Sequence, residues 1–283
     1  MTYHQLYRHI IRILQKAGNE TPAFDCLCLF EKIFAMNRQA IIIDGEKLAD
    51  TEKTKQILAL AEKRATGYPL QYLCGIWQFM DYEFFVGEGV LIPREDTVSV
   101  VELCAEQIRK NNIANPNILD LCAGSGAISI ALARIFPEST VTALELSPTA
   151  FSYLEKNIIH NQCQNITPVY GDVLKDTPKF SEHTFDVIIS NPPYIITDEI
   201  PTLQKEIQYE PLLALDGGKD GYTFYRKIIS DWTYTLKENG ILVFELGENQ
   251  YETVEKYMLE HHFLDIHPAY DIQHIKRGIL GTV

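Results

Sequence analysis

The fold of this chain is decided by the stretch Asp186-Val187-Ile188-Ile189-Ser190-Asn191-Pro192-Pro193-Tyr194. The apolar run at its start predicts a short buried strand. Two consecutive prolines then prevent both sheet pairing and an ordinary helix start, so the strand must end abruptly in an extended, stiff conformation. Asn191 is therefore expected at the carboxyl end of a strand, with Tyr194 just beyond it. In open α/β sheets, ligands bind at this edge.

The groups at this corner suit a planar partner that carries an NH2 group. The side-chain oxygen of Asn191 and the carbonyl oxygen of Pro192 can each accept a hydrogen bond, and the prolines have no N–H to compete. Two acceptors at a fixed separation fit an amide or an exocyclic amine, and the ring of Tyr194 gives that group a surface for stacking. The alternative is a surface loop, because Asn-Pro alone is a common turn signal. The whole run, placed directly after a strand, favours a binding site.

Strands and helices alternate from residue 117 onward. Strands are expected at 118–121, 140–145, 166–170, 185–190 and 241–246, and helices at 127–136, 148–160 and 221–236, with a further helix from Thr97 capped by Asp96 or Thr97. This alternation predicts an α/β fold with a doubly wound, mostly parallel sheet. The end of the chain differs, because 262–267 and 277–283 are candidate strands with little helix between them. An antiparallel pair at the sheet edge fits that pattern.

Residues 1–74 are predicted to form a separate helical domain. Leu6, Ile10 and Leu14 recur at helical spacing, and a second helix follows the Thr21-Pro22 start signal. A third helix is expected from about Thr51 to Gly67. Residues 75–92 are aromatic and β-prone, which predicts a hairpin linking this domain to a larger one at 93–283. The helical domain holds no constellation for chemistry, so docking of a partner and simple support of the larger domain remain equal alternatives.

Three features of the alternating region suit a nucleoside lying across the strand ends. The first is the turn Asp120-Leu121-Cys122-Ala123-Gly124-Ser125-Gly126, where glycines let a ligand approach the backbone. The second is Glu145 at the end of the next strand, an acceptor suited to the two hydroxyl groups of a ribose. The third is Gly171-Asp172-Val173, where Asp172 could accept from an adenine amino group and Val173 could pack on the ring. Each feature alone also fits an ordinary turn or a surface carboxylate.

Composition restricts the class of protein further. The 283 residues carry a net charge of −13 and are 46% hydrophobic, which supports a substantial core and argues against a large phosphate-binding face. The six cysteines form no C-x-x-C pair, and neither they nor the histidines show metal-ligand spacing, so no metal is expected. The first residues resemble neither a signal nor a transit peptide, and no apolar run is long enough to cross a membrane. We therefore expect a cytoplasmic protein with reduced thiols.

The sequence resembles the bacterial release factor glutamine methyltransferase family (HemK/PrmC-like). The resemblance is carried by the motif Asn191-Pro192-Pro193-Tyr194, typical of S-adenosylmethionine-dependent enzymes that methylate amide or amine nitrogens, and by the glycine turn. Further matching pieces lie along nearly the whole chain: Gly67–Tyr72, Trp77 with Phe79, Leu91-Ile92-Pro93-Arg94, Glu210-Pro211, Ala214-Leu215, Gly217–Gly221, Glu245-Leu246-Gly247 and Gln250. The Leu-Ile-Pro-Arg run favours this family over a related one that acts on a ribosomal protein.

The resemblance implies a class I methyltransferase fold, a helical N-terminal substrate-docking domain and methylation of the glutamine amide in the Gly-Gly-Gln motif of peptide chain release factors. S-adenosylmethionine is the implied methyl donor, and a release factor the implied partner, with no membrane and no direct nucleic-acid contact. The implied donor-binding residues are Cys122, Ala123, Gly124, Ser125, Gly126, Glu145, Asp172, Val173 and Asn191. The implied substrate-binding residues are Asn191, Pro192, Pro193, Tyr194, Arg94 and Glu210, of which Asn191, Pro192 and Tyr194 are the catalytic candidates.

Several positions depart from the family pattern, and two other functions remain open. Glu95, Val98, Asp81 and Cys122 stand where the family usually has proline, glutamate, glycine and glycine. These departures concern local loop geometry more than the reaction. An adenine N6-methyltransferase acting on nucleic acid would use a related motif, but the acidic charge disfavours it. A nucleoside-binding regulatory module without catalysis would not need the intact corner at Asn191. Arg94 and Glu210 could shape a substrate mouth or form a structural ion pair.

Overall fold

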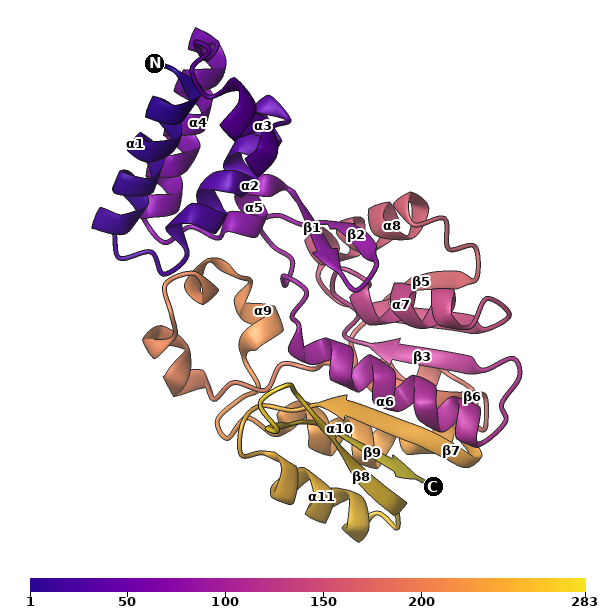
Figure 1. Ribbon diagram of the computed structural model, residues 1–283. Coiled ribbons are helices and arrows are strands. Elements are labelled where there is room, and N and C mark those ends of the chain that lie inside the picture. The colour runs from indigo at the N-terminus through magenta and orange to yellow at the C-terminus, as the bar shows by residue number, and fades with distance from the viewer. The chain divides into compact units, whose positions relative to one another are not determined.

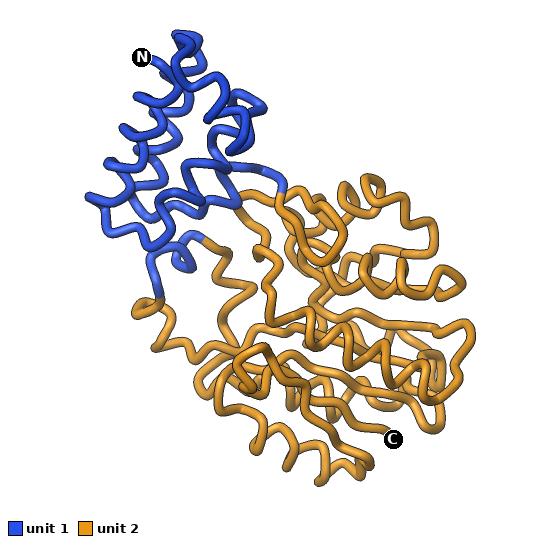
Figure 2. The backbone as a smooth tube through the Cα atoms, in the orientation of Figure 1, with its two compact units in different colours: residues 1–76, 204–209 blue, residues 77–203, 210–283 orange.

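The computed structural model describes residues 1–283. The chain divides into two compact units, which are coloured separately in Figure 2. The first, which we call the helical unit, contains residues 1–76 and 204–209. The second, the sheet unit, contains residues 77–203 and 210–283. No helix in either unit combines the length and apolar character required to cross a bilayer.

The helical unit is built from short amphipathic helices that bury one face each. They are α1 (Tyr3–Lys16), α2 (Pro22–Phe34), α3 (Arg38–Asp44), α4 (Thr51–Ala65) and α5 (Leu70–Cys74). In α1, the predicted apolar positions Leu6, Ile10 and Leu14 are fully buried. Side-chain caps fix three of the helix starts: Thr2 before α1, Asn37 before α3 and Asp50 before α4. Helices α3 and α5 were not predicted from sequence, because they are too short to show a helical period.

The sheet unit contains a seven-stranded sheet in the order β5-β4-β3-β6-β7-β9-β8. The strands are β3 (Asn117–Leu121), β4 (Thr140–Glu145), β5 (Ile166–Tyr170), β6 (Phe185–Ser190), β7 (Leu236–Glu245), β8 (Leu264–Tyr270) and β9 (Lys276–Thr282). Strands β3 to β7 run parallel, and β9 pairs antiparallel with both β7 and β8. The predicted doubly wound sheet with an antiparallel pair at its end is confirmed. A separate two-stranded sheet joins β1 (Ile76–Phe79) to β2 (Tyr82–Phe85).

Helices cover both faces of this sheet. They are α6 (Asp96–Lys110), α7 (Ala127–Ile135), α8 (Pro148–His160), α10 (Thr223–Asp231) and α11 (Tyr251–Glu260), whereas the short helix α9 (Leu212–Leu215) lies in the connection between β6 and α10. Figure 1 shows α6 and α7 on one face and α10 on the other. Alternate strand residues point to opposite faces, and one set, including Leu119, Ile188 and Phe244, joins residues of α10 and α11 in a buried apolar cluster. The opposite face of the sheet is also buried, since Ile118, Val187 and Val243 are fully buried. Such continuous apolar strands are typical of a sheet covered on both sides.

Two expectations about helix boundaries were wrong, and one helix was not predicted. The helix expected over 221–236 ends at Asp231, because Thr233 and Thr235 bond back to the carbonyls of Ile229 and Trp232 and turn the chain into β7. The helix predicted from Thr97 begins one residue earlier and is capped by Glu95, without a side-chain bond. Helix α11 was not anticipated at all, although its buried residues Tyr251, Val254 and Met258 have helical spacing.

Candidate active site

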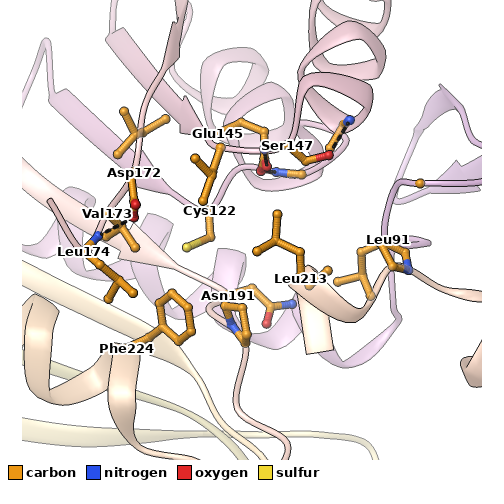
Figure 3. A pocket seen from close by; sticks show the side chains of 18 residues that line it. Leu91, Cys122, Glu145, Ser147, Asp172, Val173, Leu174, Asn191, Leu213 and Phe224 are labelled. Carbon is orange, nitrogen blue, oxygen red and sulfur yellow. Dashed lines mark hydrogen bonds between the residues drawn. The ribbon is translucent and has the colours of Figure 1, made fainter. Parts of the chain in front are cut away.

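A cleft opens within the sheet unit at the carboxyl ends of β3, β4, β5 and β6, and its empty space, including the part open to solvent, is about 800 Å³. Figure 3 shows Glu145 and Asn191 on opposite sides of this cleft. Its other walls are mainly apolar, with Leu174 and Phe224 at one end and Leu91 and Leu213 at the other. An apolar cleft with a few directed polar groups at the ends of parallel strands fits a ligand such as a nucleoside.

The predicted glycine turn leads from β3 into α7 along one side of the cleft. Cys122 and Gly124 line the cleft, whereas Ala123, Ser125 and Gly126 lie behind it. A side chain at Gly126 would be strained, because φ there is 85°, and its Cβ would lie 2.6 Å from Leu154 Cδ1 in α8 and force that side chain to shift. Cys122 has a φ of 63°, in the left-handed region that glycine adopts without strain. Cys122 therefore adopts the backbone conformation that a glycine would take at this position, and its side chain lines the cleft.

Glu145 ends β4 with its carboxylate held by backbone donors. One oxygen accepts from the N–H of Gly124 at 2.8 Å, and the other accepts from the N–H of Ser147 at 2.7 Å. The side chain is almost fully buried. Burial raises the pKa of Glu145, while the backbone hydrogen bonds lower it. Each carboxylate oxygen retains acceptor capacity, so a diol could still donate to Glu145 from the cleft.

Asp172 and Val173 follow β5 and line the same cleft. The Asp172 carboxylate accepts from the N–H of Leu174 at 2.9 Å and from Lys175 Nζ at 2.7 Å. Its own N–H donates to Asp176 Oδ2 at 2.9 Å. These bonds form a tight turn that fixes the side chain, as the dashed contact to Leu174 in Figure 3 shows. The aspartate is therefore both a turn residue, as the alternative interpretation held, and a wall of the cleft.

Two of the four residues in the corner after β6 line the cleft, and Tyr194 beyond them is partly buried. Asn191 and Pro193 line the cleft, and Pro192 and Tyr194 do not. Ser190 anchors the strand end, because its hydroxyl donates to the carbonyl of Leu121 in β3 at 2.6 Å. The Asn191 side chain has no hydrogen-bond partner in the protein, so both its oxygen and its NH2 group are available to a ligand.

Tyr194 is held by a buried polar network that the sequence analysis did not identify. Its hydroxyl donates to Glu245 Oε1 at 3.4 Å, and its carbonyl accepts from Gln250 Nε2 at 3.0 Å. Thr97 Oγ1 donates to Glu245 Oε2 at 2.5 Å, and Tyr225 donates to the Glu245 carbonyl at 2.9 Å. Burial raises the pKa of the Glu245 carboxyl to about 7. This network joins α6, β7 and α10 to the corner and fixes where Tyr194 lies.

Arg94 and Glu210 form an ion pair, which was one of the two expectations for them. The Glu210 carboxylate is almost fully buried and also accepts from the N–H of Ile92 at 3.1 Å. This pair fixes the Leu91 to Arg94 run against the chain just before Pro211. Pro211, Leu213 and Ala214 then form one wall of the cleft.

The other residues of the cleft wall could not be identified from the sequence. Leu174, Leu213 and Phe224 are apolar residues in short elements or loops, where an exposed wall and a core position look alike in sequence. A second buried carboxylate, Asp120, lies beneath the glycine turn and accepts from Ser129 at 2.5 Å. Burial raises the pKa of Asp120 to about 7, and its Oδ1 atom has no partner. No cluster of three His, Cys, Asp or Glu side chains is arranged to bind a metal ion.

Comparison with known proteins gives matches along most of the chain. The family model described as the PrmC N-terminal domain matches residues 5–75, and the Methyltransferase small domain matches residues 98–208. The release factor glutamine methyltransferase of Fusobacterium nucleatum is 35% identical over 262 residues, covering 91% of this chain and 72% of that protein. The protein of the same name from Thermodesulfovibrio yellowstonii is 39% identical over 231 residues, covering 81% and 82%.

A further relative from another bacterium and a solved structure also match. The release factor glutamine methyltransferase of Clostridium acetobutylicum is 31% identical over 271 residues, covering 95% of this chain and 94% of that protein. Among solved structures, the release factor-specific protein-(glutamine-N5) methyltransferase from Alicyclobacillus acidocaldarius is 26% identical, with a TM-score of 0.42. That match covers 70% of this chain and 98% of the other.

Proposed function

The chain belongs to the release factor glutamine methyltransferase family, and from this premise we propose that it transfers a methyl group from S-adenosylmethionine to the side-chain amide nitrogen of a glutamine in a peptide chain release factor. The proposed target is the glutamine of the Gly-Gly-Gln motif. One observation carries the assignment at the level of the site. The Asn191 amide lies at the end of β6, faces the cleft and has no partner within the protein.

The residues of the cleft fit the methyl donor by their chemistry. Glu145 offers carboxylate oxygens to the ribose hydroxyl groups, and Val173 and Phe224 offer apolar surface to the adenine ring. A Cβ added at Gly124 would meet no atom within 4 Å, so the turn leaves open space where a ligand could approach the backbone. The donor would supply an electrophilic sulfonium methyl group. The protein's own residues must then place the acceptor nitrogen.

Asn191 and Pro192 would orient the glutamine carboxamide. An amide NH2 group has two N–H donors in one plane, and the Asn191 side-chain oxygen and the Pro192 carbonyl are two acceptors on a stiff piece of chain. As the new N–C bond forms and the S–C bond breaks, positive charge develops on the nitrogen. Acceptor oxygens stabilise that charge more strongly than they stabilise the neutral amide. The nitrogen then loses its proton to solvent, so no general base is needed before transfer.

Tyr194 would contribute the flat surface beside the amide. Its hydroxyl bond to Glu245 and its carbonyl bond from Gln250 fix its backbone and ring within the sheet unit. A ring held in this way costs little further entropy when a substrate packs on it. Arg94 and Glu210 would contribute to the substrate side by holding the Leu91 to Arg94 run against the chain before Pro211.

The helical unit is proposed to dock the release factor, within the domain division of 1–74, 75–92 and 93–283 predicted from sequence. Because release factors act on ribosomes, the proposed substrate places the protein in the cytoplasm. The donor chemistry requires no metal ion.

A labelling experiment tests this proposal. The protein is incubated with S-adenosylmethionine labelled on its methyl group and either a release factor, the same factor with its Gly-Gly-Gln glutamine changed to alanine, or DNA and RNA. We expect label in the unchanged release factor only, at that glutamine. Label in nucleic acid would instead support an adenine methyltransferase, and equal labelling of both release factors would move the target to another residue.

A further inference from the structure

Six residues in the middle of the long β6–α10 connection belong to the helical unit. Residues 204–209 group with residues 1–76, although the chain on both sides of them belongs to the sheet unit. The backbone therefore passes between the two units three times, at residues 76–77, 203–204 and 209–210. Figure 2 shows this short segment in the colour of the helical unit. A linker that only joins two units would need a single passage.

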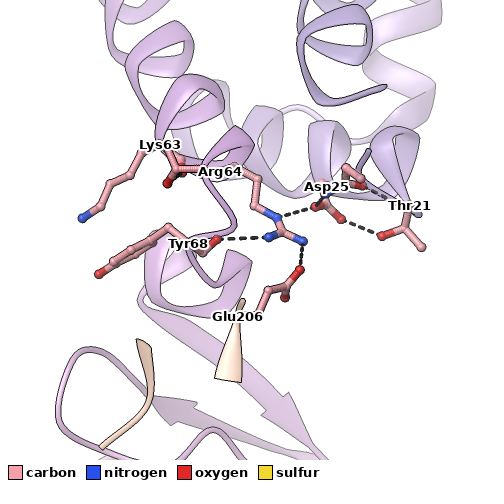
Figure 4. Close-up of polar contacts among 8 residues, drawn as sticks. Thr21, Asp25, Lys63, Arg64, Tyr68 and Glu206 are labelled. Atoms are coloured by element: carbon pink, nitrogen blue, oxygen red, sulfur yellow. Dashed lines mark hydrogen bonds and ion pairs between the residues drawn. The ribbon is translucent and has the colours of Figure 1, made fainter. Parts of the chain in front are cut away.

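Arg64 of α4 is the centre of the polar contacts that hold this segment. Its Nε donates to Asp25 Oδ2 at 2.6 Å, one terminal nitrogen donates to the Tyr68 carbonyl at 3.1 Å, and the other donates to Glu206 Oε1 at 2.6 Å. Figure 4 shows the guanidinium group between Asp25 and Glu206. The Arg64 side chain is only 7% exposed, so water screens these charges weakly. Charge-assisted hydrogen bonds of this geometry are stronger than hydrogen bonds between neutral groups.

An aromatic contact and a close approach of two chain segments also hold residues 204–209. The ring of Tyr209 packs edge-on against Tyr68, with centroids 5.1 Å apart. A Cβ added at Gly67 would lie 3.0 Å from Lys205 Cβ, so the segment runs close against the turn after α4. Contacts at Lys205, Glu206 and Tyr209 fix the segment along its length rather than at one point.

The segment leads directly into the wall of the cleft. Tyr209 is followed by Glu210, whose buried carboxylate pairs with Arg94. The next residues are Pro211, Leu213 and Ala214, which line the cleft. The fixed φ of Pro211 and the short helix α9 restrict the backbone between Tyr209 and this wall. A displacement at Glu206 is therefore transmitted along a few residues of constrained backbone.

We propose that Glu206, held by Arg64, is a positioning residue that couples the helical unit to the cleft wall formed by Pro211, Leu213 and Ala214. A protein substrate bound to the helical unit would thereby also set the shape of the acceptor side of the cleft. This inference rests on the proposed function for its substrate, although not for the coupling itself. Glu206 touches neither donor nor acceptor, so it acts through the segment it anchors.

The variant Glu206→Ala tests the coupling better than a change at Arg64. Asp25 is 2% exposed, and loss of Arg64 would leave that carboxylate buried without its cation, which would destabilise the helical unit directly. The Glu206 side chain is 42% exposed, so its removal leaves no cavity, and Arg64 keeps Asp25 and the Tyr68 carbonyl. Glu199→Ala is the matched control, because Glu199 is an exposed carboxylate in the same connection.

Two measurements compare these variants with the parent protein. In hydrogen exchange, Glu206→Ala should speed exchange of the amides of Ala214 and Asp216 by roughly tenfold, while the amides of α1 and α4 stay unchanged. In steady-state kinetics, it should raise KM for the release factor about tenfold with kcat within about twofold, the size of a typical coupling. Glu199→Ala should change neither quantity. If Glu206→Ala loses helical circular dichroism, Glu206→Gln, which keeps the side-chain shape, replaces it with the same criteria.

The two readouts separate failure of the coupling from failure of the proposed function. Unchanged exchange at Ala214 and Asp216 in the variant would overturn the coupling, whatever the kinetics. If the parent protein does not methylate a release factor, the proposed function fails, and the exchange measurement still decides the coupling.

Discussion

The donor and acceptor sides of the cleft differ in how their polar groups are occupied. Glu145 and Asp172, at the ends of β4 and β5, each accept two hydrogen bonds from the protein itself. Asn191, at the end of β6, makes none with its side chain. The donor side is therefore rigid before any ligand arrives, whereas the acceptor side completes its hydrogen bonds only with substrate. The hydrogen bonds that Asn191 forms only with substrate can therefore position the reacting nitrogen.

The largest effect is expected at Asn191. Asn191→Ala should lower kcat by roughly a hundredfold or more, as loss of one preorganised polar group does in other enzymes. The donor side keeps its internal bonds, so affinity for S-adenosylmethionine should change by less than about threefold. Initial rates at saturating release factor, together with calorimetric titration of the donor, measure the two quantities. A near-normal kcat would show that the free amide is not what places the substrate.

Glu145→Gln should show the opposite pattern. The carboxamide can accept only one of the two N–H groups of Gly124 and Ser147, and its NH2 group must face the other. Hydrogen bonds to a charged group contribute about 1.5–3 kcal/mol, so donor affinity should fall by roughly tenfold to a hundredfold. At saturating donor, kcat should remain within a few-fold of the parent value. A drop in kcat with unchanged donor affinity would mean that the two sides of the cleft are not separable.

Glu245, behind Tyr194, should make stability depend on pH. Its pKa rises from 4.5 to about 7 in the folded protein because the carboxyl is buried. The folded state therefore holds a proton that the unfolded state has lost between those values, so this contribution to stability decreases as pH rises from about 4.5 to about 7. Asp120 acts in the same direction.

Melting curves of the parent protein and Glu245→Gln between pH 5 and pH 8 isolate this contribution. The variant should lose part of the pH dependence and melt a few degrees higher than the parent at pH 8, because it buries no charge. Its kcat should fall a few-fold, since the amide holds the Tyr194 hydroxyl less well. Parallel melting temperatures of both proteins across this range would show that Glu245 titrates normally.

The smallest effect is expected at the one departure from glycine in the donor turn. Cys122→Gly relieves a left-handed conformation, which costs about 1–2 kcal/mol for a non-glycine residue. It also removes a thiol that packs against the core and adds freedom to the unfolded chain. These terms oppose each other, so the melting temperature should change by only a few degrees and donor affinity by less than about threefold. A large loss of affinity would give the thiol a direct role in binding.

The two sides of the cleft also differ in how far sequence could predict them. Glu145 and Asp172 follow strands whose period and end were visible, and β4, β5 and β6 lie where they were expected. The partners of Tyr194 were not visible, because Glu245 lies 51 residues away and nothing local marks it as the acceptor of that hydroxyl. The grouping of residues 204–209 with the helical unit was missed for the same reason. It depends on Arg64, 142 residues from Glu206.

Local sequence patterns thus predicted the strand ends that carry the site. The residues that form the walls of the cleft depend on long-range contacts. The apolar residues Leu213 and Phe224 became part of the cleft only because the β6–α10 connection folds back on itself. The bond from the Ile195 N–H to the Leu215 carbonyl closes that fold. No pattern of period or capping distinguishes such residues from ordinary core positions.

A structure of this protein bound to a release factor and S-adenosylhomocysteine would show directly whether Asn191 binds the target amide. The account predicts that Asn191 Oδ1 lies within hydrogen-bonding distance, about 2.7–3.2 Å, of the side-chain amide nitrogen of the Gly-Gly-Gln glutamine. The same nitrogen should face the sulfur of the demethylated donor in the cleft beside Glu145. A complex with that glutamine elsewhere, or with its amide bound while Asn191 faces away, would contradict the account.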